Sequence, residues 1–573
     1  MRFHANGRWR RLSYPELEQR SVEIARGLIA LGVGADDRVA ILSNTRAEWT
    51  VADLAVLFTG AAVVPVYQSN SAEETEHVLR DCGARVVFCE DDQQLEKIDA
   101  VRDRLPQLEH VLAFAGTPGR AMTLGELVAL GELVDPQEIE RHVAATRPGD
   151  ACTIVYTSGT TGEPKGCVLT HANVRANIEM VERRIHFGSP PNTVYLWLPL
   201  AHVLARMVQF LALHQGAELA YWRRDPRKIL DDLADLHPTH LPSVPRLFEK
   251  IHSFATRDVE GSRIKSRLLG WALDVGHSYQ QALERGSVAG VRLGAAHLIA
   301  DRLVLRKIRR PFGSRLKLAV TGAAPVDREI LRFFHAAGVR VLEGYGMTET
   351  TAVATVNTVD DYRFGTVGKP LPGSAVGIAE DGEVLIRGPH VFAGYFGSGA
   401  EPTVDGWLET GDLGSIDEDG FLTITGRKKD LIITSSGKNV TPASIEKALE
   451  QSRWISHAIV YGDRRPYLTA LITLDPAETP ALAETLGITD DPATLPTNEL
   501  ARDEIQRAVD EANARFARIE QIKRFVILTR DLSEQAGELT PTGKVKRSAV
   551  YDRYGHALAS MYDRDASTNG AAA

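Results

Sequence analysis

The residues best suited to chemistry form one short stretch, 156–166, which combines hydroxyl side chains, glycines and a single lysine. An apolar run at 152–156 precedes it and predicts a buried strand. Glycines let backbone N–H groups approach a ligand, hydroxyls donate hydrogen bonds, and an ammonium offsets the charge of phosphate oxygens. The stretch therefore predicts a phosphate-binding loop, with a flexible turn as the alternative. The predicted contacts are Thr157, Ser158, Gly159, Thr160, Thr161, Gly162 and Lys165.

The position of the lysine argues against an ordinary P-loop ATPase. A Walker A loop needs Gly-Lys followed by Ser or Thr, whereas Lys165 follows Pro164 and precedes Gly166. The stretch, Tyr-Thr-Ser-Gly-Thr-Thr-Gly-Glu-Pro-Lys-Gly, instead resembles the phosphate-binding loop of the adenylate-forming superfamily. That superfamily includes acyl-CoA synthetases, luciferases and nonribosomal-peptide adenylation domains. The resemblance implies that the loop binds ATP.

A second segment, Gly-Tyr-Gly-Met-Thr-Glu-Thr at 344–350, resembles the part of the same family that surrounds the nucleotide. The resemblance implies that Tyr345 stacks on adenine, Thr348 contacts a phosphate and Glu349 is a magnesium ligand. Mg²⁺ prefers oxygen ligands and is usually bound by one or two carboxylates plus substrate phosphates. Thr157 is a further candidate ligand. Taken alone, the segment is typical of a Gly-rich turn.

Small residues and two charged residues complete the nucleotide site that the resemblance implies. Asp412, in Trp-Leu-Glu-Thr-Gly-Asp, would accept hydrogen bonds from both ribose hydroxyls, because a carboxylate has two acceptor oxygens. Arg427 would also reach the ribose. Without this context Asp412 would be an ordinary turn or capping residue. The small residues expected around adenine are Gly322, Ala323, Ala324 and Gly346.

The lysine expected to assist catalysis lies near the C-terminus, in Leu-Thr-Pro-Thr-Gly-Lys-Val-Lys-Arg at 539–547. This run resembles the family loop that carries the catalytic lysine, which implies Lys544. Lys546 is the alternative if the register of the loop is shifted. An ammonium group beside a carboxylate and a triphosphate lowers their mutual repulsion as charge redistributes.

Two further segments of the C-terminal part resemble elements with family roles. Gly-Arg-Lys-Lys-Asp at 426–430 resembles the hinge between the two family domains, with Lys429 at the pivot, and a solvated charge run is the alternative. Residues 435–442 resemble the loop that lines the pantetheine tunnel of acyl-CoA synthetases, and a strand-to-helix turn is the alternative. The residues on the coenzyme A side are Gly437, Lys438 and Asn439.

Residues 197–202 and 239–250 resemble segments of bacterial long-chain fatty acyl-CoA synthetases. The resemblance places His202 near the acyl carboxylate or its gate, with a structural histidine as the alternative. Apolar residues follow it near helical spacing and could line an acyl tunnel or belong to the core. Each buried methylene contributes about 0.8 kcal/mol, so a tunnel could favour long acids. The tunnel candidates are Leu204, Met207, Val208 and Leu211.

Alternating strand and helix patterns must position these residues. A capping box at Ser13–Glu16 begins a helix. Apolar runs at 39–42, 62–66 and 85–89 predict strands separated by helical segments. Such alternation predicts a mostly parallel sheet with helices on both faces, whose carboxyl strand ends carry the chemistry. Residues 246–310 predict a long helical excursion from the sheet.

The remaining sequence predicts two further units. Asp-Gly turn signals between short β-rich runs at 381–426 predict an antiparallel subdomain. Helix-like runs at 442–451 and 503–516, with strand-like runs at 468–474 and 524–529, predict a small α+β unit.

The fold class is therefore α/β. We predict a large N-terminal domain, 1–426, of parallel or mixed sheets layered with helices plus a β-rich subdomain. A small mobile α+β lid domain follows at 427–562, and 563–573 is expected to be a disordered tail.

Composition limits the function classes that remain. The 573 residues carry a formal net charge of −9, which offers no basic footprint for nucleic acid. No signal peptide is recognisable, and the most apolar stretch, 51–67, is shorter than the roughly 20 residues of a membrane span. We expect a cytoplasmic protein, with peripheral association at the inner face of a membrane left open. Four cysteines lack metal-ligand spacing and suit a reducing cytosol: Cys82, Cys89, Cys152 and Cys167.

These features predict an ATP- and Mg²⁺-dependent ligase that converts a medium- to long-chain fatty acid to acyl-AMP and then to acyl-CoA. The expected partners are fatty acid, ATP and coenzyme A, without nucleic acid, and a homodimer is left open. A fatty acyl-AMP ligase that loads a carrier protein and a nonenzymatic lipid or nucleotide sensor on the same fold are the alternatives. The resemblance covers residues 7–554, and relatives often begin with additional residues, so the start of this chain is short by comparison.

Overall fold

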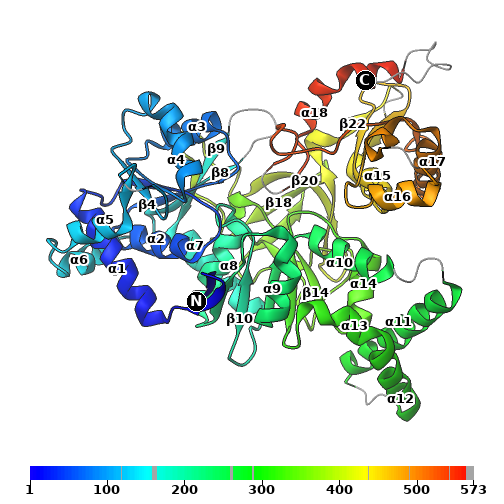
Figure 1. Cartoon of the computed structure of the whole chain (residues 1–573), viewed down its shortest axis with the longest axis horizontal. Helices are drawn as coiled ribbons and strands as arrows, with labels where there is room; N and C mark the ends of the chain where they lie inside the picture. Colours follow the sequence, from blue (N-terminus) through cyan, green and yellow to red (C-terminus); the bar gives the residue numbers. More distant parts are fainter. Residues whose placement is uncertain are drawn as a thin grey trace.

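The computed structural model describes residues 1–117, 119–157, 164–257, 262–286, 290–435, 438–488, 491–540 and 543–562. The tail predicted to be disordered, 563–573, lies outside the described residues. A broad body of sheets and helices carries the C-terminal elements at its upper right, and two helices project at its lower right (Figure 1).

An eight-stranded sheet near the N-terminus is built from apolar runs. Its central strand β4 (Ala62–Val66) is buried at every position, as expected where helices cover both faces of a sheet. The strand predicted at 62–66 is thus confirmed to the residue. In spatial order the other strands are β19 (Gly394–Tyr395), β9 (Lys165–Thr170), β8 (Ala151–Thr157), then past β4, β3 (Arg38–Leu42), β5 (Val86–Cys89), β6 (His110–Ala113) and β7 (Met122–Thr123).

The helices between these strands begin where local caps predict. The backbone N–H of Ser13 donates to the Glu16 carboxylate at 2.7 Å, and the Glu16 N–H donates to Ser13 Oγ at 3.4 Å, so the capping box is confirmed. The helices are α1 (Tyr14–Ala30), α2 (Ala47–Phe58), α3 (Ala72–Cys82), α4 (Asp92–Val101), α5 (Leu124–Gly131), α6 (Gln137–Ala145) and α7 (His171–Arg184).

A nine-stranded sheet forms the second half of the body. Its core strands β10, β12, β13 and β14 run parallel, so their carboxyl ends meet at one edge. In spatial order its strands are β16 (Lys369–Pro370), β15 (Thr355–Val356), β14 (Val341–Tyr345), β13 (Leu318–Thr321), β12 (His240–Ser243), β10 (Thr193–Leu196), β11 (Glu218–Tyr221), β1 (Arg2–Ala5) and β2 (Arg8–Arg11). Its helices include α8 (Val203–His214), α9 (Ile229–Leu236), α10 (Pro245–Arg257) and α14 (Arg328–Ala336).

The helical excursion and the antiparallel subdomain are both present. The excursion comprises α10, α11 (Arg263–Glu284), α12 (Val291–Ala300), a π-helical turn at Asp301–Leu305 and α13 (Arg306–Arg309). The subdomain is a four-stranded antiparallel sheet of β17 (Ala375–Ile378), β18 (Glu383–Arg387), β20 (Leu408–Ile416) and β21 (Leu422–Arg427).

The C-terminal residues form a separate α+β unit with its own apolar core. The predicted strand at 468–474 is confirmed, but the helix predicted to begin at 503 begins at 499, and one strand was missed. The elements are β22 (Ile432–Ile433), β23 (Asn439–Val440), α15 (Pro442–Leu449), the missed strand β24 (Ile455–Tyr461), β25 (Leu468–Leu474), α16 (Thr479–Leu486), α17 (Glu499–Asn513), β26 (Ile522–Ile527), α18 (Arg547–Arg553) and α19 (Gly555–Ser560). Among the described residues, no helix has both the length and the apolarity needed to cross a membrane.

Candidate active site

A cleft of about 3640 Å³ opens where the carboxyl ends of β8, β13 and β14 face the C-terminal unit. Most predicted site residues that the structure describes line this one cleft, although they come from distant parts of the chain. Residues 158–162 and Gly437 lie outside the described residues. The lining residues predicted from sequence are Thr157, Lys165, His202, Leu204, Gly322, Ala323, Ala324, Tyr345, Gly346, Thr348, Glu349, Asp412, Arg427, Lys429 and Lys544.

Asp412 is the centre of the corner predicted to bind ribose. It lies on β20, its side chain is only 6% exposed, and its register partner on β21 is Arg427. Tyr345 Oη donates to Asp412 Oδ2 at 2.7 Å, and Arg427 Nε lies 2.8 Å from Asp412 Oδ1. Burial and the nearby Asp412 charge raise the pKa of Tyr345, so its hydroxyl stays protonated and remains a donor.

The adjoining wall requires small residues. Gly322, Ala323 and Ala324 follow β13, and Ala323 has a left-handed backbone with a φ of 71°. At Gly346 a Cβ atom would lie 2.0 Å from the carbonyl oxygen of Ala352, which no side chain could tolerate. The backbone next to Tyr345 therefore approaches its neighbour closely only because residue 346 is glycine.

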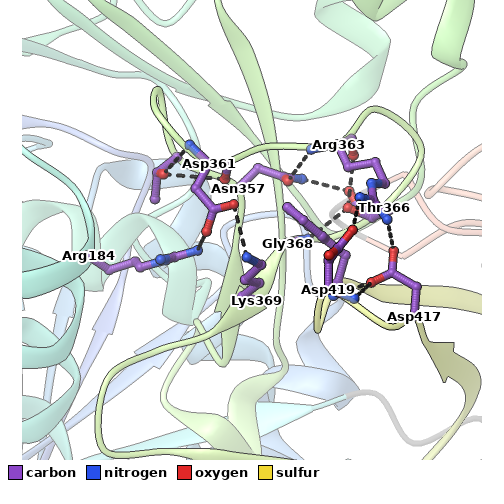
Figure 2. A network of polar contacts seen from close by, with 11 residues as sticks. Arg184, Asn357, Asp361, Arg363, Thr366, Gly368, Lys369, Asp417 and Asp419 are labelled. Carbon is purple, nitrogen blue, oxygen red and sulfur yellow. Dashed lines mark hydrogen bonds and ion pairs between the residues drawn. The ribbon is translucent and has the colours of Figure 1, made fainter.

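A polar network surrounds the segment between β15 and β16 (Figure 2). Asp361 pairs with Arg184 at 3.1 Å and with Lys369 at 3.0 Å, while Asn357 Nδ2 donates to the carbonyl of Thr366 at 2.7 Å. A second set joins Arg363 to Asp417 and Asp419 on the loop between β20 and β21. The network ties the segment between β15 and β16 to the sheet that carries Asp412.

Glu349 is held by a tyrosine that the sequence reasoning missed. Tyr395 Oη donates to Glu349 Oε1 at 2.8 Å, and the ammonium of Lys165 lies 5.5 Å from the centre of the same ring. Glu349 is itself buried, 8% exposed. The buried thiol of Cys167 also contacts Glu349 and Thr157, and burial raises its pKa well above the usual range. Tyr395 thus connects the predicted metal ligand with the predicted phosphate ligand.

Lys544 reaches this cleft from the C-terminal unit. Its loop is closed by a bridge between Leu539 and Val545 and by the Lys544 N–H, which donates to Thr540 Oγ1 at 3.0 Å. Desolvation within the cleft, followed by the charge of Arg427, lowers the pKa of Lys544, while Asp412 opposes that shift. Lys546 instead lies 3.6 Å from Glu74 on α3.

His202 lies at the start of α8, where its Nδ1 accepts a hydrogen bond from the N–H of Leu204 at 3.2 Å. Desolvation and the nearby Lys544 charge lower the pKa of His202 to about 4, so the ring is neutral near pH 7. Because Nδ1 accepts, the ring proton of the neutral form is on Nε2.

The helix that follows His202 is anchored by buried charges. Arg206 Nε donates to Asp53 at 3.3 Å and Gln209 donates to the same carboxylate at 2.8 Å, which joins α8 to α2. Of the tunnel candidates only Leu204 lines the cleft. The other three pack into apolar clusters of the body: Met207, Val208 and Leu211.

The predicted hinge and coenzyme A loop lie at the entrance of the C-terminal unit. Lys429 lines the cleft within a short 3₁₀ turn, and its neighbour Lys428 pairs with Glu383 at 2.8 Å. Lys438 and Asn439 are exposed and are not among the residues that line the cleft.

Two family models match almost the whole chain. Residues 2–396 match AMP-binding enzymes, and residues 429–566 match the C-terminal domain of AMP-binding enzymes. The chain belongs to the family of AMP-binding enzymes.

Curated relatives match this AMP-binding enzyme over nearly its full length. It is 40% identical over 570 residues to long-chain-fatty-acid–CoA ligase FadD15 of Mycobacterium bovis, covering 98% of this chain and 94% of that protein. It is 31% identical over 600 residues to long-chain-fatty-acid–CoA ligase ACSBG2 of Xenopus laevis, covering 98% and 81%. The solved structure of anthranilate CoA ligase AuaEII with anthranoyl-AMP shares the fold, with a TM-score of 0.72, 20% identity, and coverage of 97% and 94%.

The oxygen atoms around Glu349 suit a magnesium ion that is held mainly by substrate. Among the described residues, no group of three or more His, Cys, Asp or Glu side chains could form a complete metal cage. A buried carboxylate and the hydroxyl of Thr157 are the hard donors that Mg²⁺ prefers, with phosphates and water as further ligands. The donor set of this AMP-binding enzyme therefore fits such an ion.

Proposed function

We propose that this AMP-binding enzyme is an ATP-dependent ligase that activates a medium- to long-chain fatty acid as acyl-AMP and transfers the acyl group to coenzyme A. The observation that carries the proposal is the convergence of Lys544 with His202, Asp412 and Arg427 in one cleft. Proteins named long-chain-fatty-acid–CoA ligases match the chain at 40% and 31% identity, which supports this substrate class.

In the proposed first half-reaction, a carboxylate oxygen of the acid attacks the α-phosphorus of ATP and pyrophosphate leaves with the electron pair of the broken bond. Asp412 and Tyr345 hold the nucleoside, and Lys544 and Arg427 offset the negative charge around the reacting phosphate. The neutral His202 donates from Nε2 toward the acid carboxylate. Positioning by these groups lowers the entropic cost of bringing two anions together.

We propose that Glu349, with Thr157 as a further ligand, holds the magnesium ion that accompanies ATP. When bound, the ion neutralises part of the phosphate charge. Lys165, together with Thr348 and the loop residues Ser158, Gly159, Thr160, Thr161 and Gly162, supplies the remaining phosphate contacts. Gly322, Ala323, Ala324 and Gly346 leave room for adenine beside Tyr345.

For the second half-reaction we place the domain boundary between residues 426 and 427 and the pivot at Lys429. Rotation of the C-terminal domain withdraws Lys544 and brings Gly437, Lys438 and Asn439 to the cleft, an alternation that gates the two steps. The thiol sulfur of coenzyme A then attacks the acyl carbon, AMP leaves, and the thiol proton is released to solvent. Leu204, with Met207, Val208 and Leu211 behind it, is the proposed acyl-binding face.

We propose a cytoplasmic location with peripheral attachment to a membrane, because long-chain acids concentrate in bilayers.

The first test of the proposed reaction is product-resolved turnover of ATP with palmitate, magnesium and coenzyme A, with an acid series from acetate upward. Palmitoyl-CoA and AMP are expected as products. Acyl-AMP without thioester would indicate a carrier-protein ligase, and no AMP with any acid would overturn the proposal in favour of a sensor.

A further inference from the structure

The two helices that project from the body form a hairpin whose outer side has no partner in the described structure. The hairpin comprises residues 262–310, with α11, α12, the π-helical turn and α13 (Figure 1). Its inner side is firmly anchored. Ala272 and Gly276 of α11 are buried, and a Cβ atom at Gly276 would lie 2.2 Å from the carbonyl oxygen of Ala336 on α14. The rings of Tyr279 and His297 stack at 3.8 Å and join α11 to α12.

Each helix of the hairpin exposes large apolar side chains at helical spacing. On α12, Val291 is 91% exposed, Leu298 71% and Ile299 55%, and these positions recur at i, i+7 and i+8. On α11, Ile264 and Trp271 are 81% and 39% exposed, seven residues apart. Residues at this spacing share one face of a helix. An apolar helical face exposed to this extent is typical of an interaction surface.

The same hairpin is strongly cationic in an acidic protein. Residues 262–310 contain ten Lys and Arg against three Asp and Glu, a net charge of +7, whereas the whole chain carries −9. The other residues therefore carry −16. Arg292, Arg302 and Arg306 are exposed, and none pairs with an acidic group among the described residues. The hairpin therefore carries exposed positive charge on the same segment as its exposed apolar side chains.

We infer that the outer side of this hairpin binds the surface of an anionic lipid bilayer. Apolar side chains would enter the interface between headgroups and acyl chains, while the arginines would contact anionic headgroups. A symmetric pair of hairpins from two copies of this chain would bring two charges of +7 together, which disfavours a second copy as the occupant.

The position of the hairpin suits an enzyme that takes its acid from a membrane. Pro245, Arg246 and Glu249 at the start of α10 line the cleft, and α10 is the described helix that precedes the hairpin in the sequence. The inference deepens the proposed membrane attachment by naming the surface that binds, and it does not depend on the proposed ligase reaction, because lipid binding requires neither ATP nor turnover.

The test measures sedimentation of the full-length protein with vesicles of phosphatidylcholine, alone or with about one third phosphatidylglycerol. We expect at least about tenfold tighter binding to the anionic vesicles, and a loss of at least about tenfold in the triple variant Arg292→Glu, Arg302→Glu, Arg306→Glu. A second triple variant, Val291→Ser, Leu298→Ser, Ile299→Ser, should also weaken binding while leaving the thermal unfolding midpoint unchanged, because these side chains are exposed.

Matched controls use exposed residues outside the hairpin. The control for the arginine variant makes the same change in net charge: Arg8→Glu, Arg10→Glu, Arg518→Glu. The control for the apolar variant removes the same number of exposed apolar side chains: Leu133→Ser, Val404→Ser, Leu500→Ser. Equal loss in the controls, or no vesicle binding at all, overturns the inference. The inference is also overturned if analytical ultracentrifugation detects a dimer of the wild type and the hairpin variants are monomers. Acyl-CoA formation from soluble decanoate should be unchanged in the hairpin variants, so a failure of lipid binding leaves the proposed ligase reaction standing.

Discussion

The corner around Asp412 and the loop around Lys544 face each other across the cleft, yet they are built in opposite ways. Asp412, Tyr345 and Arg427 lie on strands β20, β14 and β21, and Asp412 is joined to Tyr345 by a hydrogen bond and to Arg427 by an ion pair. Lys544 lies on an exposed loop that is closed by contacts within the loop itself, among them the Leu539–Val545 bridge and the hydrogen bond from the Thr540 N–H to the carbonyl of Lys544 at 2.7 Å. In the proposed mechanism, the nucleotide is therefore bound by groups fixed in the body, whereas the charge that assists the chemistry is carried on a loop of the C-terminal unit that the proposed rotation withdraws.

The largest effect is expected from Lys544→Ala, which removes the movable charge and leaves the fixed corner intact. We expect adenylation to fall by about 100- to 1000-fold. Thioester formation from supplied acyl-AMP should change by less than about threefold, because in the proposed mechanism Lys544 acts only in the first step. Pyrophosphate release and acyl-CoA formation are measured separately. A similar loss in both steps would contradict the division between the two regions.

The same comparison predicts a pH dependence. The pKa of Lys544 is lowered, so its positive charge is lost as pH rises through that lowered value, earlier than for an ordinary lysine. Adenylation should therefore decline on the alkaline side while thioester formation from acyl-AMP does not. In the Lys544→Arg variant the guanidinium stays charged at these pH values. The residual adenylation rate of this variant should therefore not decline as the pH rises. Rates of both steps between pH 7 and pH 10 provide the measurement.

A smaller effect is expected at Tyr395, within the fixed region. Tyr395→Phe removes the hydrogen bond to Glu349 but keeps the ring beside Lys165, and a hydrogen bond to a charged group contributes about 1.5–3 kcal/mol. We expect the magnesium concentration for half-maximal adenylation to rise by about tenfold or more. Magnesium titrations of wild type and variant measure this shift. Tyr551→Phe, at a half-buried tyrosine elsewhere in the cleft wall, is the control and should leave the magnesium dependence unchanged.

The smallest effect on stability or activity is expected from the polar network of Figure 2, between β15 and β16. Arg363→Ala removes partly exposed ion pairs to Asp417 and Asp419, and such pairs contribute at most about 1 kcal/mol. The free energy of unfolding of the variant should fall by about that amount, and the KM for ATP should not change. Urea unfolding and steady-state kinetics measure both, with Arg518→Ala as a surface control. A large rise in KM would show that the network positions Asp412 as well as stabilising the fold.

Strands and caps were predictable where the local pattern alone determines them. The run at 62–66 is uniformly apolar and forms a fully buried strand. The start of α1 is determined by the capping box of Ser13 and Glu16, which lies within four residues of sequence. Strand β24 was missed because Ser456 and His457 interrupt its apolar pattern. Both side chains bond to Asp531, which lies 75 and 74 residues away. Such a partner is invisible to local periodicity.

The site could be predicted only in part for the same reason. Motif resemblance identified Tyr345, Asp412 and Lys544, which line one cleft. It did not identify Tyr395, because nothing near that residue indicates that it contacts Glu349, 46 positions earlier. The start of α17 was placed too late, although Asn498 carries the cap signal, with Oδ1 accepting from the N–H of Leu500 at 2.9 Å.

The pairing of Asp412 with its own neighbours also bears on how easily the enzyme turns over. Both carboxylate oxygens already have partners, Tyr345 on one side and Arg427 on the other. In the proposed nucleotide site, a ribose that enters therefore meets a carboxylate whose charge Arg427 already balances, and it can use the acceptor sites that remain on both oxygens. Departure of AMP from such a site would leave no unpaired buried anion, because Arg427 and Tyr345 stay in contact with Asp412.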